Sequence, residues 1–218
     1  MLPVCDAVPA PTKPLMTLAL LAVVIVVFLA LPPAATSFVG TSSIAPRWLP
    51  GMMNAALATV RPVDWLTLVA TLLALWLYGP TVEDRMGRPR FALLYFGSGL
   101  LAAAGVTAAG LATWMNMGGT AASVAAVIGA RLTLYPRGRT LMLIPVTDGL
   151  DVIDVPSGMV AGFWFLAQLA SAGTHLHLAP GWSASTAVIH ILAGAILGSI
   201  GVRLLARQER MRVEWWNP

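Results

Sequence analysis

Residues 119–130 read Gly119-Thr120-Ala121-Ala122-Ser123-Val124-Ala125-Ala126-Val127-Ile128-Gly129-Ala130, and this stretch determines which fold the chain can adopt. It is rich in Gly and Ala, and it carries two hydroxyl groups and no charge. Small residues let helices approach closely inside a bilayer, where lipid tails are as apolar as the helices themselves. The stretch therefore predicts a membrane-spanning helix in close contact with other helices.

The composition of the chain agrees with a membrane protein. Of its 218 residues, 58% are apolar and only 10% are charged. Soluble domains carry about 25% charged residues. The net charge of +4 arises from basic residues between and after the apolar segments, which favours a role in membrane topology over nucleic-acid binding. Cys5 is the only cysteine, so no intrachain disulfide is possible.

The apolar segments predict an all-α, polytopic bundle of six transmembrane helices. We expect one membrane domain over residues 15–205, between a Pro-rich tail at 1–14 and a basic, aromatic tail at 206–218. Each segment is near the length that a bilayer requires, and a helical bundle satisfies its backbone hydrogen bonds without strands. The expected spans are 15–31, 63–79, 91–112, 118–135, 156–172 and 185–205.

The first span has a second interpretation, as a cleaved signal peptide. The sequence Pro32-Pro33-Ala34-Ala35-Thr36 is a poor cleavage site, and five apolar segments follow it. A retained first helix is therefore favoured.

Basic residues predict the orientation of the bundle. Of the 13 Lys and Arg residues, only Arg47 and Arg61 fall on one predicted side, and the others share the opposite side. Cytoplasmic loops carry the excess of Lys and Arg, so both termini are expected in the cytoplasm. We expect a multi-pass protein of the plasma (inner) membrane of a bacterium.

Tryptophans predict where the chain meets the membrane surface, because Trp is enriched at membrane–water interfaces. The connection over residues 33–62 is only moderately polar and is expected to lie in this interface. Arg203, Arg207 and Arg210 repeat at helical spacing, which fits a helix on anionic headgroups or a contact with a partner subunit. The expected anchors are Trp48, Trp65, Trp215 and Trp216.

Several separate stretches carry a family resemblance. Residues 79–91 read Gly79-Pro80-Thr81-Val82-Glu83-Asp84-Arg85-Met86-Gly87-Arg88-Pro89-Arg90-Phe91. Further stretches are Leu134-Tyr135-Pro136-Arg137-Gly138-Arg139, Gly162-Phe163-Trp164-Phe165 and Gln168. Together they resemble the rhomboids, a family of intramembrane serine proteases, over about residues 47 to 205. Without the family, Glu83-Asp84-Arg85 is interpreted as a charged turn at the headgroup level.

The resemblance implies where catalytic groups would stand. Rhomboids carry Gly-x-Ser-Gly on the fourth helix, and the nucleophile position here is Ala121. The pair His-x-x-x-Asn on the second helix, which helps to hold the oxyanion, falls on Thr67 and Thr71. On the sixth helix the base position becomes Ile191, with His190 one residue early. Since an alanine has no attacking group, we expect no catalytic residues and a rhomboid-like pseudoprotease.

The function that follows is binding without cleavage. We expect the protein to bind transmembrane segments of other membrane proteins, as a scaffold, an escort or a subunit of a membrane complex. The alternative is an active intramembrane serine protease that uses Ser123 as nucleophile and His190 as base. Thr120 is a weaker candidate, because a neighbouring position on a helix points about 100° away.

The small residues have two interpretations. Gly194 and Gly198 lie four apart and present a face that another helix can approach. That helix is either the fourth span of the same chain, whose small residues include Gly119, Ala122 and Gly129, or a helix of another protein. Packing within the chain is favoured.

No cofactor and no metal site is expected. His175 and His177 have no Cys or carboxylate near them in sequence. The acidic residues Asp148, Asp151 and Asp154 are interpreted as part of a turn that faces Arg137 and Arg139. A transporter is disfavoured, because Arg131 is expected to extend to the nearby membrane surface.

Overall fold

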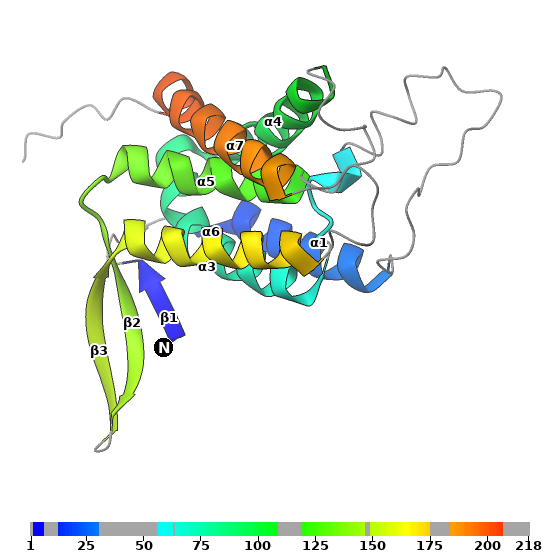
Figure 1. Cartoon of the computed structure of the whole chain (residues 1–218). Helices are drawn as coiled ribbons and strands as arrows, with labels where there is room; N and C mark the ends of the chain where they lie inside the picture. Colours follow the sequence, from blue (N-terminus) through cyan, green and yellow to red (C-terminus); the bar gives the residue numbers. More distant parts are fainter. Residues whose placement is uncertain are drawn as a thin grey trace, which may run out of the picture.

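The computed structural model describes residues 2–6, 13–30, 56–62, 64–108, 119–146, 149–174 and 184–206. Helices make up most of this part of the chain (Figure 1). Each predicted span contains a long helix, although the ends differ by several residues. The helices are α1 (Leu15–Ala30), α3 (Trp65–Met86), α4 (Arg88–Ala108), α5 (Gly119–Leu134), α6 (Ser157–Thr174) and α7 (Ala184–Leu205).

The prediction of a structure without strands is wrong. The strands β1 (Leu2–Asp6), β2 (Arg139–Val146) and β3 (Gly149–Pro156) form an antiparallel sheet in the order β1-β2-β3. The hairpin β2–β3 projects from the end of the bundle at which α5 ends and α6 begins, called the sheet end below (Figure 1). Within the predicted tail over residues 1–14, Leu2–Asp6 form β1 and belong to this sheet. Backbone hydrogen bonds to β2 hold β1 in an extended conformation, which the Pro-rich sequence did not indicate.

Capping residues mark both ends of the helix α3. The carboxylate of Asp64 accepts a hydrogen bond from the backbone N–H of Thr67 at 2.6 Å, which caps the first turn. Gly87 ends the helix with a φ of 81°, a left-handed conformation that favours glycine. The helix extends well beyond the predicted end at residue 79 and contains Pro80.

Glu83-Asp84-Arg85 is interpreted from the sequence as a charged turn, but in the structure Glu83 does not lie in a turn. It belongs to α3 and is only 2% exposed. Its carboxylate accepts hydrogen bonds from the backbone N–H groups of Met16 and Thr17, at 2.9 and 2.8 Å, and from the Thr17 hydroxyl at 2.7 Å. An acidic side chain at the start of a helix satisfies free N–H groups and opposes the helix dipole. Glu83 therefore attaches α1 to α3.

The core of the bundle is α5, which contacts α3, α4 and α7 (Figure 1). Every residue from Gly119 to Arg131 is buried except Ala121, which is half-buried. Its small residues let the neighbouring helices approach. Gly194 and Gly198 of α7 lie directly on α5, because a Cβ on either would overlap the backbone of Ala122 or Ala126. On α5, Gly129 lies in the same way against Ala195.

Arg131 also differs from the expectation. Its side chain is fully buried instead of extending to the membrane surface. The guanidinium lies 4.7 Å from the centre of the Tyr135 ring and donates a hydrogen bond to the Tyr135 carbonyl at 3.2 Å. Arg85 packs against the same ring, at 5.3 Å. This cation–π arrangement stabilises the sheet end, where α5 leaves the bundle.

The surface around the helices is apolar. Large hydrophobic side chains are exposed along α1, α3, α6 and α7, among them Val26, Val69, Phe163 and Ile196. By length and hydropathy, Trp65–Met86 and Ala187–Leu205 each suffice to cross a membrane, and Leu15–Ala30, Gly119–Leu134 and Ser157–Ala172 are shorter apolar helices. Helices with such surfaces indicate an integral membrane protein.

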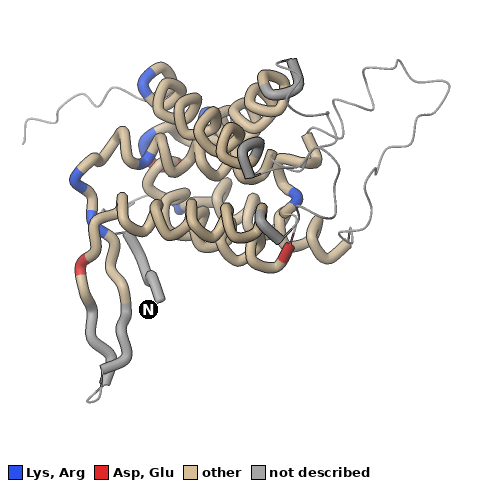
Figure 2. The backbone as a smooth tube through the Cα atoms, viewed as in Figure 1, with Lys and Arg blue, Asp and Glu red and all other residues tan. Residues whose placement is uncertain are grey.

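Charged residues lie mainly at the ends of the bundle (Figure 2). Arg85, Arg88, Arg139 and Arg203 belong to elements that meet at the sheet end. Arg61 lies just before α3, at the opposite end, called the far end below. The middle of the bundle therefore presents apolar side chains between two charged ends.

Candidate functional site

Ala121, at the nucleophile position that the resemblance implies, lies in the first turns of α5. It is half-buried and packs against the hydrophobic core. The preceding residue, Thr120, donates its hydroxyl hydrogen to the carbonyl oxygen of Ala58, at 2.7 Å. Gly119 fits against the same segment, because a Cβ there would lie 2.9 Å from the Ala58 carbonyl carbon. This hydrogen bond therefore connects the segment that precedes α3 to the start of α5.

Ser123, the fallback nucleophile, points at α4. Its side chain is fully buried, and a Cβ on Gly99 of α4 would overlap its Oγ. Among the described residues, Ser123 Oγ has no hydrogen-bond partner. It therefore makes no hydrogen bond to His190. A serine nucleophile requires a base within hydrogen-bonding reach, and this arrangement lacks that contact.

Both candidates for the base lie on the inward face of α7. His190 is 1% exposed and Ile191 is 4% exposed. One turn further along α7, Gly194 contacts Ala122 of α5. The contact of Gly194 with Ala122 and of Gly198 with Ala126 brings the base region of α7 level with the start of α5. At that level, the position on α5 that the resemblance assigns to the nucleophile is occupied by Ala121, whose side chain is a methyl group.

The oxyanion-pair positions on α3 have different surroundings. Thr67 Oγ1 is hydrogen-bonded to Ser171 Oγ of α6 at 2.8 Å, and Ser171 also donates to the Asp64 carboxylate at 2.7 Å. The Thr67 hydroxyl is thereby engaged between the two helices. Thr71 lies one turn deeper and is fully buried, and its Oγ1 has no partner in the described part of the chain.

Within the described residues, hydrogen-bonded contacts join α3 to α6 near both ends of the pair. At the far end, the contact is the group of Asp64, Thr67 and Ser171 described above. At the sheet end, Tyr78 donates its hydroxyl hydrogen to the carbonyl oxygen of Ser157, at 2.9 Å. Between these two contacts the helices separate and leave a groove.

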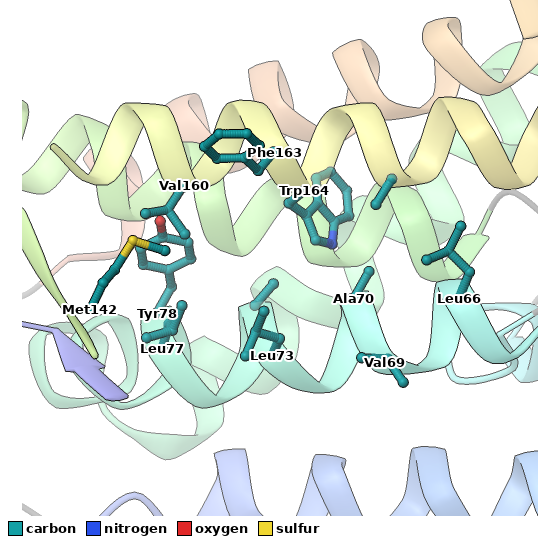
Figure 3. A pocket seen from close by; sticks show the side chains of 12 residues that line it. Leu66, Val69, Ala70, Leu73, Leu77, Tyr78, Met142, Val160, Phe163 and Trp164 are labelled. Carbon is teal, nitrogen blue, oxygen red and sulfur yellow. The ribbon is translucent and has the colours of Figure 1, made fainter. Parts of the chain in front are cut away.

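This α3–α6 groove has a volume of about 350 Å³ (Figure 3). Its walls are apolar apart from the Tyr78 hydroxyl and the indole nitrogen of Trp164, and Met142 of β2 closes it at the sheet end. Val69 and Phe163 on its rim are 59% and 60% exposed. The groove thus opens to the apolar surroundings of the bundle. Its lining residues are Leu66, Val69, Ala70, Leu73, Ala74, Leu77, Tyr78, Met142, Val160, Phe163, Trp164 and Ala167.

Some of the predicted residues lie outside the described part of the chain. These are Trp48, Asp148, His175, His177, Arg207, Arg210, Trp215 and Trp216. The anchor Trp65 begins α3, is 67% exposed, and packs edge-to-face on Phe28 of α1. Asp154 lies on β3 and forms an ion pair with Arg139 at 3.8 Å. Within the described residues, no cluster of three or more His, Cys, Asp or Glu side chains could hold a metal.

Sequence reasoning missed Asp64 and Ser171, and it gave Tyr78 and Trp164 no role of their own. A signal for Asp64 was present, because an acidic residue directly before an apolar run is typical of a helix N-cap. Ser171 carried no signal, since its role depends on a hydrogen bond to residues more than 100 positions away. The groove likewise exists only because α3 and α6 lie side by side.

Comparison with known proteins adds one result. The family model described as Rhomboid domain matches residues 51–208. No curated protein and no solved structure gives a significant match. The matched region covers α3 to α7 and therefore every residue of the site described above.

Proposed function

Since this chain belongs to the rhomboid family, an integral membrane family of intramembrane proteases, we propose that it is a pseudoprotease that binds transmembrane segments of other membrane proteins without cutting them. It acts as a scaffold, an escort or a subunit of a membrane complex. One observation carries the proposal: the nucleophile position holds Ala121, and the nearest serine on the helix, Ser123, has no hydrogen-bond partner among the described residues.

The loss of several catalytic elements supports inactivity. Peptide-bond hydrolysis needs an activated nucleophile and preorganised donors for the oxyanion. Here the hydroxyl of Thr120 is bonded to Ala58, and that of Thr67 is engaged with Ser171. Restoring a hydroxyl at position 121 alone would leave Ile191 at the base position and threonines at the oxyanion positions.

The α3–α6 groove supports the binding function. An occupant must suit an apolar cleft that faces lipid, and a single transmembrane helix of another protein has that surface. Leu66 and Val69 on one wall and Phe163 on the other offer exposed apolar contacts. Helix association in lipid depends on packing contacts of this kind.

The proposal includes a membrane placement. In this placement the six apolar helices each span the membrane. The sheet end lies in the cytoplasm, because arginines cluster at that end and cytoplasmic loops carry the excess of Lys and Arg. Both termini are then cytoplasmic, and the host membrane is the bacterial plasma membrane. The sheet lies at the cytoplasmic mouth of the groove.

The enzymatic half of the proposal is tested with a fluorophosphonate probe, which labels activated serines. Purified protein and its Ala121→Ser variant are expected to remain unlabelled, with an active rhomboid protease as the positive control. Labelling of the unmodified protein that disappears in Ser123→Ala would overturn the pseudoprotease assignment and establish the protease alternative.

The binding half is tested with a photo-crosslinking amino acid at Phe163, in the groove, and at Ile196, an exposed residue of α7 outside it. We expect crosslinks from position 163 to map to apolar segments of partner proteins, and to be lost when Val69→Trp fills the groove. Position 196 should give mainly lipid adducts. Equal protein crosslinking at both positions, or insensitivity to Val69→Trp, would contradict the assignment of the groove.

A further inference from the structure

The outer half of the hairpin β2–β3 is apolar on both of its faces. Successive residues of a strand lie on opposite faces, so the cross-strand pairs alternate between the two faces. One face of the outer half carries only apolar residues, and the other carries Asp151 as its one charged residue. An antiparallel sheet with one face in water would alternate apolar and polar residues, and this segment does not. Its residues are Leu143, Ile144, Pro145, Val146, Gly149, Leu150, Asp151 and Val152.

The inner half of the hairpin packs on the bundle. Thr140 is fully buried, and Met142 is 8% exposed and closes the α3–α6 groove. Their cross-strand partners, Val155 and Ile153, are half-buried and pack against the hydrophobic core. This packing accounts for the apolar residues near the base. The outer half projects away from the helices, so its apolar residues need another explanation (Figure 1).

The direction of the hairpin suits a membrane surface. In Figure 1 it runs across the direction of α3, α5 and α6 instead of continuing it. The helices of an integral membrane protein cross the bilayer, so a hairpin that leaves their ends in this direction extends along the membrane surface. Arg137 and Arg139 are exposed at its base, where the phosphates of anionic lipids attract basic side chains. The base of the hairpin therefore lies at the level of the headgroups.

The edges of the sheet limit how deep the hairpin can lie. Among the described residues, the order β1-β2-β3 leaves the outer edge of β3 without a neighbouring strand, and β1 reaches along β2 only to Leu143. Edge strands carry N–H and C=O groups that need hydrogen-bond partners. The hydrocarbon core offers none, whereas the interface offers water and headgroups. Apolar faces and open edges together fit the interface, and neither the hydrocarbon core nor bulk water.

We propose that the hairpin β2–β3 is a membrane-surface element whose outer half inserts between the headgroups and the upper acyl chains of the bilayer at the sheet end. The partner is the lipid bilayer itself, because the hairpin continues the apolar surface of the bundle and carries arginines at its base. Since Met142 of β2 closes the α3–α6 groove, the insertion fixes the level at which the groove meets the membrane surface. This role of the hairpin is independent of whether the protein cuts or binds other helices.

The test measures the depth of a fluorescent label on Leu150→Cys, in the full-length protein with Cys5→Ser. The vesicles consist of phosphatidylethanolamine and phosphatidylglycerol with bromine atoms either near the headgroup or near the end of the acyl chain, and bromine quenches a label at its own depth. We expect the strongest quenching by the shallow bromines, at a depth of about 5–10 Å into the headgroup–acyl boundary. Iodide in the buffer should quench this label much less than it quenches the free label.

Leu101→Cys on α4 is the control for the hydrocarbon core. Leu101 is 61% exposed and lies about 20 Å along the helix from Arg88, so its label should be quenched most by the deep bromines.

Charges on a cross-strand pair should expel the outer half from the bilayer. Pro145 and Leu150 are partners, so Pro145→Asp with Leu150→Asp places two charges at one level of the hairpin. We expect a label on Val152→Cys to lose its quenching by lipid and to gain quenching by iodide. The matched variant Pro145→Ala with Leu150→Ala should keep the quenching by lipid. Lipid quenching that survives in the Asp variant would contradict the insertion.

Three further results would overturn the inference. Iodide quenching at position 150 equal to that of the free label would place the hairpin in water. Quenching by the deep bromines as strong as that at position 101 would place it in the hydrocarbon core. Protection from both lipid and iodide, with crosslinks to a second copy or to another protein, would show that protein covers the outer half.

Discussion

Glu83 shows how much of this fold can depend on one side chain. Its carboxylate is buried beside the start of α1 and receives three hydrogen bonds from Met16 and Thr17. The guanidinium of Arg88 lies 3.9 Å away and is largely exposed. The charge is thus offset mainly by N–H and O–H donors at a helix start, where the helix dipole also favours an anion.

We expect Glu83→Ala to lower the free energy of unfolding by about 2–4 kcal/mol, because it leaves buried donors at the start of α1 without an acceptor. The measurement is reversible unfolding in mild detergent or bicelles. Asp154→Ala is the control, since it removes an exposed carboxylate from an ion pair and should cost less than about 1 kcal/mol. Equal losses for the two variants would show that Glu83 does not hold α1.

At the scale of elements, the packing of α7 on α5 explains the glycines in both helices. Gly198 and Gly194 lie against backbone atoms of α5, which cannot move aside as a flexible side chain can. Close backbone approach of this kind is how helices associate in membranes. The same contact fixes which residues of α7 stand opposite Ala121, so the packing and the candidate site depend on one register.

We expect Gly198→Ala to destabilise the bundle by at least about 2 kcal/mol, since the added methyl group overlaps the backbone of Ala126. Gly97→Ala on α4 is the matched control. Nothing lies within 4 Å of a Cβ there, and an alanine should stabilise the helix by about 0.5–1 kcal/mol. Thermal unfolding of both variants measures the difference, and a stabilising Gly198→Ala would contradict the packing described.

At the scale of the whole molecule, the distribution of charge divides the bundle into two ends. The sheet end collects arginines from α3, α4, α5, α7 and β2, whereas the far end carries Arg61 and Asp64 (Figure 2). A bilayer places such an excess of positive charge on the cytoplasmic side. The proposed orientation of the groove in the membrane rests on this rule.

The orientation is measured with membrane-impermeant maleimide on intact cells, in a Cys5→Ser background without other cysteines. Arg139→Cys introduces a thiol at an exposed position of the sheet end, and Ala56→Cys introduces one at an exposed position near the far end. We expect labelling of position 56 in intact cells and of position 139 only after the membrane is opened. The opposite pattern would reverse the proposed topology.

Family membership and the positions of the helices, to within several residues, could be predicted from the sequence, as could the residues at the positions that the resemblance assigns to catalysis. These features depend on local composition and on short motifs, such as the apolar runs and the residues from Gly79 to Phe91. The hairpin β2–β3 was also foreseeable. Asp148-Gly149 between two segments rich in β-branched residues is a typical hairpin signal, and the apolar interpretation of the chain overlooked it.

The remaining features depend on contacts between segments that are far apart in the sequence. Glu83 acquires its role from residues 66 and 67 positions earlier, and β1 pairs with a strand more than 130 positions later. The Thr67 hydroxyl is hydrogen-bonded to Ser171, and Ser123 lies against Gly99 of α4, because separate helices lie side by side. Hydrogen bonds and burial are properties of neighbours in space, and a sequence records neighbours only along the chain.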